Sequence, residues 1–277
     1  MLKFFKNKDR HFSNIIHIKD ESSNQSFKMQ TFVDSYIENE IATFGLYGRF
    51  EKESLRIWAF LSKYSHNIID VGANTGIYSM LAKTNNNQAN VLAVEPIDYN
   101  FKVLKSNINL NNYSVFTEKV ALSNVNGEAK MFMFKDRLNY MTSVNENRYI
   151  HNPHVIEGKE IIETIVPLVR FEVLFERYQF NGIDLMKIDV EGHEIEVLSS
   201  LEYFLDKFHP TILIEVISDS IANGVQNILS KYNYMYIAID EESKPKLVDK
   251  IWDNNHHNFL ICTKEIVRIL KENDLII

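Results

Sequence analysis

Cysteine is nearly absent from this chain, which has 277 residues and only Cys262 as a thiol. A disulfide framework and a cysteine-based zinc site are therefore excluded, which fits a reducing compartment such as the cytoplasm. Long apolar runs are also missing, because no stretch approaches the roughly 20 residues that a membrane-spanning helix requires. Basic residues are fewer than acidic ones: the chain has 30 Lys and Arg and 37 Asp and Glu, for a formal net charge of −7. That balance argues against a general nucleic-acid-binding protein.

The N-terminal part of the chain shows little hydrophobic periodicity. Residues 1–10 combine two Phe with four basic residues but contain no apolar signal core, so we do not expect a secretion signal. We predict that residues 1–30 form a flexible extension with little regular structure and that residues 31–277 form one domain. The helical hydrophobic pattern over residues 31–66 predicts that this domain begins with a helical segment.

Residues 68–76, with the sequence IIDVGANTG, predict a short buried strand, a turn and the start of a helix. Gly72 and Gly76 mark places where the backbone passes close to another group, because glycine has no Cβ. A helix N-terminus after such a turn offers unpaired N–H groups and a positive dipole end, which suit a carboxylate or a phosphate. The spacing Gly-x-x-x-Gly differs from the Gly-x-Gly-x-x-Gly of dinucleotide-binding proteins, which weighs against a nicotinamide cofactor.

A second apolar run, residues 91–94, is followed by Glu95 and Pro96. An acid at the tip of the second strand is where doubly wound α/β folds bind the ribose hydroxyls of a nucleoside. Pro96 prevents the strand from continuing, and we expect Asp98 to cap the next helix, which we place at residues 98–112. The two motifs together predict a nucleoside-binding half-fold.

Strand-like and helix-like segments alternate over the rest of the chain, which implies a parallel sheet with helices on both faces. Asn126-Gly127 is typical of a β-hairpin turn. The long polar segment 135–160, which carries His151 and His154, is a candidate substrate-loop insertion. We predict further strands at 115–120, 128–134, 161–166, 183–189, 211–216, 234–239 and 258–263, and helices at 170–178, 195–201 and 220–231.

Acidic side chains and a histidine cluster at the end of the predicted strand that reaches Asp189. Asp189, Glu191 and His193 alternate, so they would share one side of an extended chain, and one of them could act as a general base. Purely structural roles are alternatives to catalysis for some of these residues. Glu191 and Glu194 would also be favoured at a helix N-terminus, and Lys187 could neutralise a buried Asp189.

Three segments together resemble the FkbM-type family of S-adenosylmethionine-dependent methyltransferases, namely DVGANTG at 70–76, VEP at 94–96 and KIDVEGHE at 187–194. The resemblance covers residues 44–263. It implies an α/β fold with a doubly wound, seven-stranded Rossmann-like methyltransferase sheet, preceded by an N-terminal helical extension. The last strand, Asn258–Thr263, would lie antiparallel. The resemblance also implies O-methylation of a sugar, a glycolipid or polysaccharide precursor, or a natural product.

S-adenosylmethionine is then the expected cofactor. The turn after the first strand would hold its methionine part, Glu95 its ribose hydroxyls and Leu122-Ser123 its adenine. For proton removal we rank Glu191 and His193 ahead of Asp189, which is closer to the strand. The predicted cofactor-binding residues are Asp70, Gly72, Asn74, Thr75, Gly76, Glu95, Pro96, Leu122 and Ser123.

A magnesium site is an alternative use of the acids, because hard cations prefer carboxylate oxygens. Asp189, Glu191 and Glu215 could supply them. Glu215, however, precedes two apolar residues in its predicted strand, which would place it too deep. We therefore expect no metal.

Other functions share parts of this pattern. A nucleic-acid or protein methyltransferase would use the same cofactor, but the acidic charge and the lack of an Asn-Pro-Pro-aromatic block argue against nucleic acid. A non-catalytic nucleoside-binding module is the alternative from another class, and the presence of Asp70, Glu95, Asp189 and Glu191 argues against it. We expect a small-molecule or glycan acceptor, no nucleic-acid partner and no integral membrane segment, with a homodimer as one form of assembly.

Overall fold

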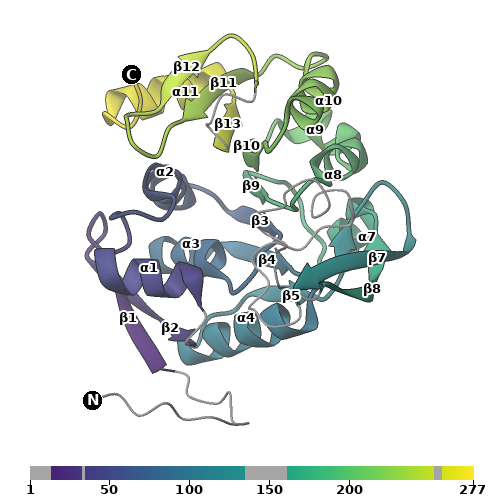
Figure 1. The fold of residues 1–277 in the computed structure, drawn as a ribbon. Helices are drawn as coiled ribbons and strands as arrows, with labels where there is room; N and C mark the ends of the chain where they lie inside the picture. The colour runs from purple at the N-terminus through teal and green to yellow at the C-terminus, as the bar shows by residue number, and fades with distance from the viewer. Residues whose placement is uncertain (1–13, 33–34, 135–160, 253–257) are drawn as a thin grey trace.

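A mixed sheet of eight strands forms the centre of the protein, in the order β12-β11-β13-β10-β9-β3-β4-β5 (Figure 1). The computed structural model describes residues 14–32, 35–134, 161–252 and 258–277. The parallel part of the sheet consists of β5 (Phe116–Glu118), β4 (Asn90–Val94), β3 (Asn67–Val71), β9 (Leu185–Ile188) and β10 (Thr211–Glu215).

The far part of the sheet contains the antiparallel strand that the sequence predicts. β13 (Asn258–Cys262) runs antiparallel between β10 and β11 (Met235–Ile239), which confirms a doubly wound sheet with an antiparallel last strand. The sheet has eight strands where seven were predicted, because β12 (Lys246–Val248) pairs antiparallel with β11 at the edge. Lys246 and Leu247 are exposed, so this short edge strand has no core-facing apolar pattern to predict it.

Side chains alternate between two hydrophobic cores, one on each face of the sheet. In β3, Ile68 belongs to one core, whereas Ile69 and Val71 belong to the other. Helices therefore cover both faces, as the alternating pattern predicts (Figure 1). On the Ile68 side lie α1 (Tyr36–Phe44), α2 (Lys52–Ser62), α3 (Ile77–Asn85), α4 (Asp98–Leu110) and α11 (Lys264–Glu272), and on the other side α7 (Phe171–Arg177), α8 (Glu194–Ser200), α9 (Glu202–Phe208) and α10 (Asp219–Leu229).

A second, smaller sheet has the order β6-β8-β7, with β6 (Ala121–Leu122), β7 (Gly127–Phe134) and β8 (Ile161–Val169). β7 pairs with β8 and not with β6, so the hairpin turn predicted at Asn126-Gly127 is wrong. The Asn126 side chain instead accepts the backbone N–H of Arg170 at 2.9 Å, which ties this turn to the end of β8. The predicted substrate loop, residues 135–160, lies outside the described residues.

The predicted cap of α4 is also wrong. Ile97 is the N-cap residue and makes no side-chain cap bond, whereas Asp98 is already in the first turn of the helix. The Asp98 carboxylate forms ion pairs with Lys102 at 2.5 Å and with Lys119 at 2.9 Å. An acid in the first turn is still favoured by the helix dipole, so the sequence signal was right about the helix start and wrong about the cap.

The expectation of little regular structure before residue 31 is wrong for residues 14–30. β1 (Asn14–Asp20) and β2 (Gln25–Thr31) form an antiparallel pair. Phe27 and Met29 alternate with exposed residues and are buried in the core with α1, α2 and α3. The alternation of apolar and polar residues in β2 indicates a strand, but the polar residues around it hid this signal in the sequence.

Asn107 in α4 and Asn111, the C-cap residue of this helix, complete the free edge of β2. The Asn111 side chain accepts the Lys28 N–H and donates to the Lys28 carbonyl, both at 2.8 Å, as a neighbouring strand would do. The Asn107 side chain accepts the Gln30 N–H at 2.8 Å. These bonds satisfy backbone groups that an edge strand otherwise leaves unpaired.

The buried carboxylate of Asp20 organises the turn between β1 and β2. It accepts hydrogen bonds from the Ser22 N–H and hydroxyl and from the side chains of Ser23, Tyr47 and Asn85, over 2.6–2.9 Å. Burial alone would raise the pKa of Asp20, but these hydrogen bonds outweigh it and lower the pKa to about 2. The carboxylate thus joins the hairpin to the segment after α1 and to the end of α3.

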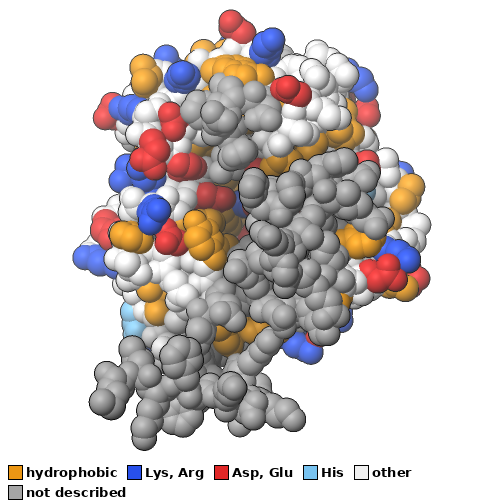
Figure 2. Space-filling model, viewed as in Figure 1, with side chains coloured by type: hydrophobic (Ala, Val, Ile, Leu, Met, Phe, Trp, Pro, Cys, Tyr) orange, Lys and Arg blue, Asp and Glu red, His pale blue; other side chains and the backbone are white. Residues whose placement is uncertain are grey.

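The visible surface carries acidic and basic side chains side by side, with hydrophobic side chains in small groups between them (Figure 2). Over the described part of this face there is no large basic patch of the kind that binds nucleic-acid backbones. Among the described residues, none of the helices has the length and apolar character needed to cross a bilayer.

Asp20→Asn should lower the free energy of unfolding by about 1–3 kcal/mol at pH 7, because an amide nitrogen would face hydrogen-bond donors. The ionised form of Asp20 stabilises the fold above its unfolded pKa, and this contribution is lost as the pH falls through the lowered pKa. The difference between parent and variant should therefore narrow between about pH 4 and pH 2. Urea unfolding at several pH values measures it, with Glu21→Gln on the same turn as the control. An equal loss in both variants would contradict this role.

Candidate functional site

A cavity of about 640 Å³ opens at the carboxyl ends of the parallel strands. Its size is typical of small-molecule sites, and the carboxyl edge of a doubly wound sheet is where such folds bind ligands. The wall comes from α1, from Glu51 before α2, from the segments after β3, β4 and β9, from the first turns of α3 and α4, and from β6, β7 and the last residue of β10. Its polar lining residues include Tyr36, Asn39, Glu40, Glu51, Asn74, Tyr78, Glu95, Asn100, Lys187, Asp189, Glu191, His193 and Glu215.

The glycine turn after β3 is folded tightly against two other strands. The N–H groups of Gly72 and Ala73 both donate to the Val94 carbonyl at 3.0 Å. Gly72 has φ +80°, and a Cβ on it would lie 1.8 Å from the carbonyl oxygen of Asp189. Gly72 is thus required by the approach of the two turns that follow β3 and β9, and the predicted close approach of the backbone to another group is confirmed there.

Asn74 has a left-handed backbone, with φ +51°. Such a conformation is uncommon outside glycine and is concentrated at functional sites. Its N–H donates to Glu95 Oε2 at 2.9 Å. Its side chain lines the cavity, and Oδ1 is buried without a hydrogen-bond partner among the described residues. An unpaired acceptor in a cavity wall is suited to an N–H or O–H group of a ligand.

Glu95 joins the turns after β3 and β4. Its two carboxylate oxygens accept the N–H groups of Asn74 and Ile97, each at 2.9 Å. The side chain is buried, and burial raises its pKa to about 7 against the opposing effect of the hydrogen bonds from Ile97, Asn74 and Asn100. Glu95 therefore shapes the cavity as well as facing it.

The structure divides the predicted cofactor residues into two groups. Gly72, Asn74, Glu95, Pro96 and Leu122 line the cavity. The other four support that wall from behind, and they are Asp70, Thr75, Gly76 and Ser123.

The supporting residues have definite partners. Asp70 is buried in β3 and accepts the Ser79 hydroxyl at 2.6 Å. The Thr75 hydroxyl donates to the buried carboxylate of Glu38 in α1. At Gly76, which precedes α3 with φ +100°, a Cβ would come within 2.6 Å of Leu104. These contacts hold the turn in place but do not reach the cavity.

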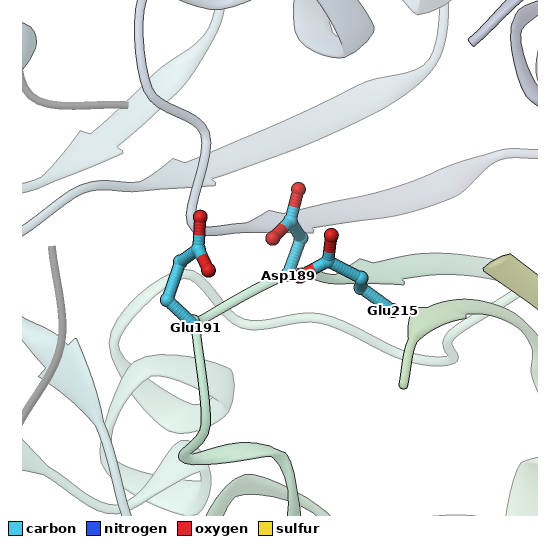
Figure 3. Close-up of side chains that lie close together, drawn as sticks. All are labelled: Asp189, Glu191 and Glu215. Atoms are coloured by element: carbon cyan, nitrogen blue, oxygen red, sulfur yellow. The ribbon is translucent and has the colours of Figure 1, made fainter. Parts of the chain in front are cut away.

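Three carboxylates that line the cavity lie close together (Figure 3). One oxygen each from Asp189, Glu191 and Glu215 lies within 4.8 Å of the others. Asp189, Glu191 and His193 line the same cavity, as predicted. The extended chain that was expected to bring them together is wrong, since Glu191 and Gly192 have φ +58° and +106°. The expectation that Glu215 lies too deep is wrong as well, because it is the last residue of β10 and lines the cavity.

Lys187 supplies the positive charge of this region. Its ammonium group lies 2.5 Å from Asp189 Oδ2 and 4.5 Å from the centroid of the Tyr78 ring. Burial would lower the pKa of Lys187, but the charges of Asp189, Glu51 and Asp70 raise it. The structural role that the sequence left open for Lys187, neutralisation of Asp189, is the one observed.

Glu51 and Tyr78 line the cavity and were not predicted. Glu51 has φ +40° and accepts the Tyr78 hydroxyl. Burial raises the pKa of Glu51 to about 7, although the charge of Lys187 opposes it. A left-handed residue before α2 leaves no sequence signal unless it is Gly or Asn, so Glu51 could not be found from the pattern.

His193 lines the cavity beside the carboxylates. Its Nε2 lies 3.0 Å from the Ser123 hydroxyl, and its Nδ1 lies 3.4 Å from the Glu196 carboxylate. Burial lowers the pKa of His193, and Glu196 opposes this in part. Glu194, in contrast, is fully buried and accepts the N–H groups of Val190 and Gly192, so it has the structural role of an acid at a helix start.

Comparison with known proteins gives one family match. Residues 70–236 match the model of the methyltransferase FkbM domain. Methyltransferase sdnD of Sordaria araneosa is 31% identical over 155 residues, which cover 49% of this chain and 60% of that protein. The hexuronic acid methyltransferase AglP of Haloferax volcanii is 24% identical over 229 residues, which cover 83% of this chain and 77% of that protein.

The chain spans less than two thirds of some of these relatives. It covers 60% of methyltransferase sdnD and 58% of methyltransferase 1 of Beauveria bassiana, to which it is 28% identical. Among solved structures, the methyltransferase FkbM of Methylobacillus flagellatus KT has a TM-score of 0.45 at 12% identity, over 72% of this chain and 43% of that one.

Gly72→Ala should lower the free energy of unfolding by about 2 kcal/mol or more, because the new Cβ would strike the Asp189 carbonyl in a left-handed turn. Gly182→Ala is the matched control, since a Cβ there meets only Asn67 Nδ2, at 3.6 Å. Denaturant unfolding of both variants measures the difference. A Gly72→Ala variant as stable as Gly182→Ala would show that the two turns do not need this close approach.

Proposed function

Because the chain belongs to the methyltransferase FkbM domain family, we propose that it is an S-adenosylmethionine-dependent O-methyltransferase. Its acceptor is a hydroxyl group of a sugar, of a glycolipid or polysaccharide precursor, or of a natural product. The observation that carries the proposal is that Asn74 and Glu95 share one cavity with Asp189, Glu191 and His193. Groups suited to hold a nucleoside and groups suited to accept a proton thus face the same space.

The lining residues fit the cofactor. The carboxylate of Glu95 has about four acceptor positions. The N–H groups of Asn74 and Ile97 and the Asn100 side chain use three of them, which leaves one for a ribose hydroxyl. The unpaired Oδ1 of Asn74 would accept an N–H of the methionine part. Leu122 and Pro96 supply apolar wall for the adenine.

The chain's own residues position the acceptor and take its proton. When bound, S-adenosylmethionine supplies an electrophilic methyl group, so alignment of acceptor and donor is the main requirement. We assign the proton to His193. Glu196 near Nδ1 favours a proton on that nitrogen, which leaves Nε2 as an acceptor. With the proton on Nδ1, Nε2 would accept the Ser123 hydroxyl, which lies 3.0 Å away, and the ring would exchange this bond for one from an acceptor hydroxyl in the cavity.

The charge of the cavity favours a neutral acceptor. Asp189, Glu191 and Glu215 would repel a carboxylate that approached as the nucleophile. A hydroxyl group carries no such penalty and can donate to these oxygens. The name of AglP records methylation of a hexuronic acid, and we place the acceptor of this chain in the same broad class of glycans, with a hydroxyl as the reacting group.

Asn74→Gly should weaken S-adenosylmethionine binding by roughly 5- to 30-fold, because a ligand N–H loses its acceptor while the left-handed backbone is kept. Asn112→Gly is the matched control, since Asn112 also has a left-handed backbone, φ +53°, but does not line the cavity. Isothermal titration with S-adenosylmethionine, NAD and a nucleotide sugar measures the affinities. A preference for NAD or the nucleotide sugar would refute the proposed cofactor.

His193→Asn should lower the turnover rate by roughly 10²- to 10⁴-fold, because the acceptor loses its general base. Affinity for S-adenosylmethionine should stay within about twofold of the parent. Turnover is followed as S-adenosylhomocysteine release with a panel of hexoses, hexuronic acids and small phenols. His209→Asn, at the exposed left-handed end of α9, is the control. Turnover at the parent rate in His193→Asn would move the base to another residue.

A further inference from the structure

We propose that Asp189, Glu191 and Glu215 form a binding site for a hard divalent cation such as Mg²⁺. The site is a property of these three side chains and does not depend on the proposed methyl transfer. It replaces the expectation of no metal, which rested on the depth of Glu215 in its strand. The three residues come from the end of β9, the turn after it, and the end of β10 (Figure 3).

The strand register brings the carboxylates together. β9 and β10 are parallel, with Ile188 opposite Ile214, so the next residues, Asp189 and Glu215, lie side by side at the ends of these strands. The left-handed turn at Glu191 then returns a third carboxylate to the same point. The sheet and this turn together set the arrangement.

The spacing of the oxygens fits one ion. One oxygen of each carboxylate lies within 4.8 Å of the other two. Mg²⁺ and Ca²⁺ bind oxygen at about 2.0–2.6 Å, so opposite ligands of one ion are roughly 4–5 Å apart and adjacent ligands are closer. Three protein oxygens on one side of an ion leave its other positions for water or for a ligand in the cavity.

Glu215 provides the second, independent observation. Its Oε2 is shielded from solvent and has no hydrogen-bond partner among the described residues. A buried carboxylate oxygen without a partner is costly and requires an explanation, of which an ion is one. Since the carboxyl group points toward Asp189 in the cluster, a cation there would satisfy it (Figure 3).

The surrounding charges leave the cluster under-neutralised. Among the described residues that line the cavity there are six carboxylates, those of Glu40, Glu51, Glu95, Asp189, Glu191 and Glu215, and one basic side chain besides His193, that of Lys187. The Lys187 ammonium is bound to Asp189 Oδ2, and its single charge also acts on Glu215. A divalent ion would supply the missing positive charge.

The full chain is first treated with EDTA to remove bound metal and is then titrated with Mn²⁺. Electron paramagnetic resonance measures the free Mn²⁺ and so gives the amount bound. We expect one saturable site from which Mg²⁺ displaces Mn²⁺. Glu191→Gln and Glu215→Gln should each weaken Mn²⁺ binding by at least tenfold, because each removes a charged ligand. Glu272→Gln, which removes an exposed carboxylate from α11, should bind Mn²⁺ as the parent does.

The absence of saturable Mn²⁺ binding would overturn the proposal. Protonation of the carboxyl groups would then explain how the cluster is neutralised. Parent-like affinity in both glutamine variants would overturn it as well. If Glu215→Gln does not fold, the Mn²⁺ affinity of Glu191→Gln, which changes a residue in a turn, tests the proposal by itself. S-adenosylmethionine titration of the stripped protein is the separate readout. Cofactor binding without Mn²⁺ binding would remove the metal site and leave the proposed function standing.

Discussion

The buried ammonium group of Lys187 is the charge on which the carboxyl edge of the sheet depends. It pairs with Asp189 at 2.5 Å, lies over the Tyr78 ring, and stands opposite Asp70 in the register of β3 and β9. Loss of one partner of a buried ion pair costs on the order of 3–5 kcal/mol, because the other charge stays behind uncompensated. β3 and β9 also carry the turns that form the cavity wall. The same ion pair therefore stabilises the centre of the sheet and fixes the site.

The N-terminal elements complete this site from outside the family match. Tyr36 in α1 and Glu51 before α2 line the cavity, although the matched region begins at residue 70. They are held there by polar contacts, such as the bond from Thr75 in the glycine turn to Glu38 in α1. The glycine turn, Glu95 and the carboxylates of the cavity thus lie within the family match, whereas Tyr36 and Glu51 lie before it.

The half-fold around β3 and β4 could be predicted because its signals are local. Gly72 and Glu95 each follow a short hydrophobic run that is easily recognised, although the contact that requires Gly72 is with the distant Asp189. The N-terminal hairpin had only the alternation in β2 as a local signal. The side chains that complete its edge, Asn107 and Asn111, lie 77 and 83 residues after the backbone groups they bind. The place of Glu215 depends on the register of two strands far apart in sequence, and sequence spacing carries no information about that register.

The excess of carboxylates gives the cavity one consistent preference. A sulfonium cofactor and a divalent cation are both cations, and both gain from a low-dielectric space lined by Asp189, Glu191 and Glu215. Lys187 cannot take the place of either, because its ammonium group is already bound to Asp189. A negatively charged acceptor would be repelled until such cations are present. If the proposed cofactor and cation bind here, their charges would offset these carboxylates, and a neutral hydroxyl would meet less repulsion than an anionic group.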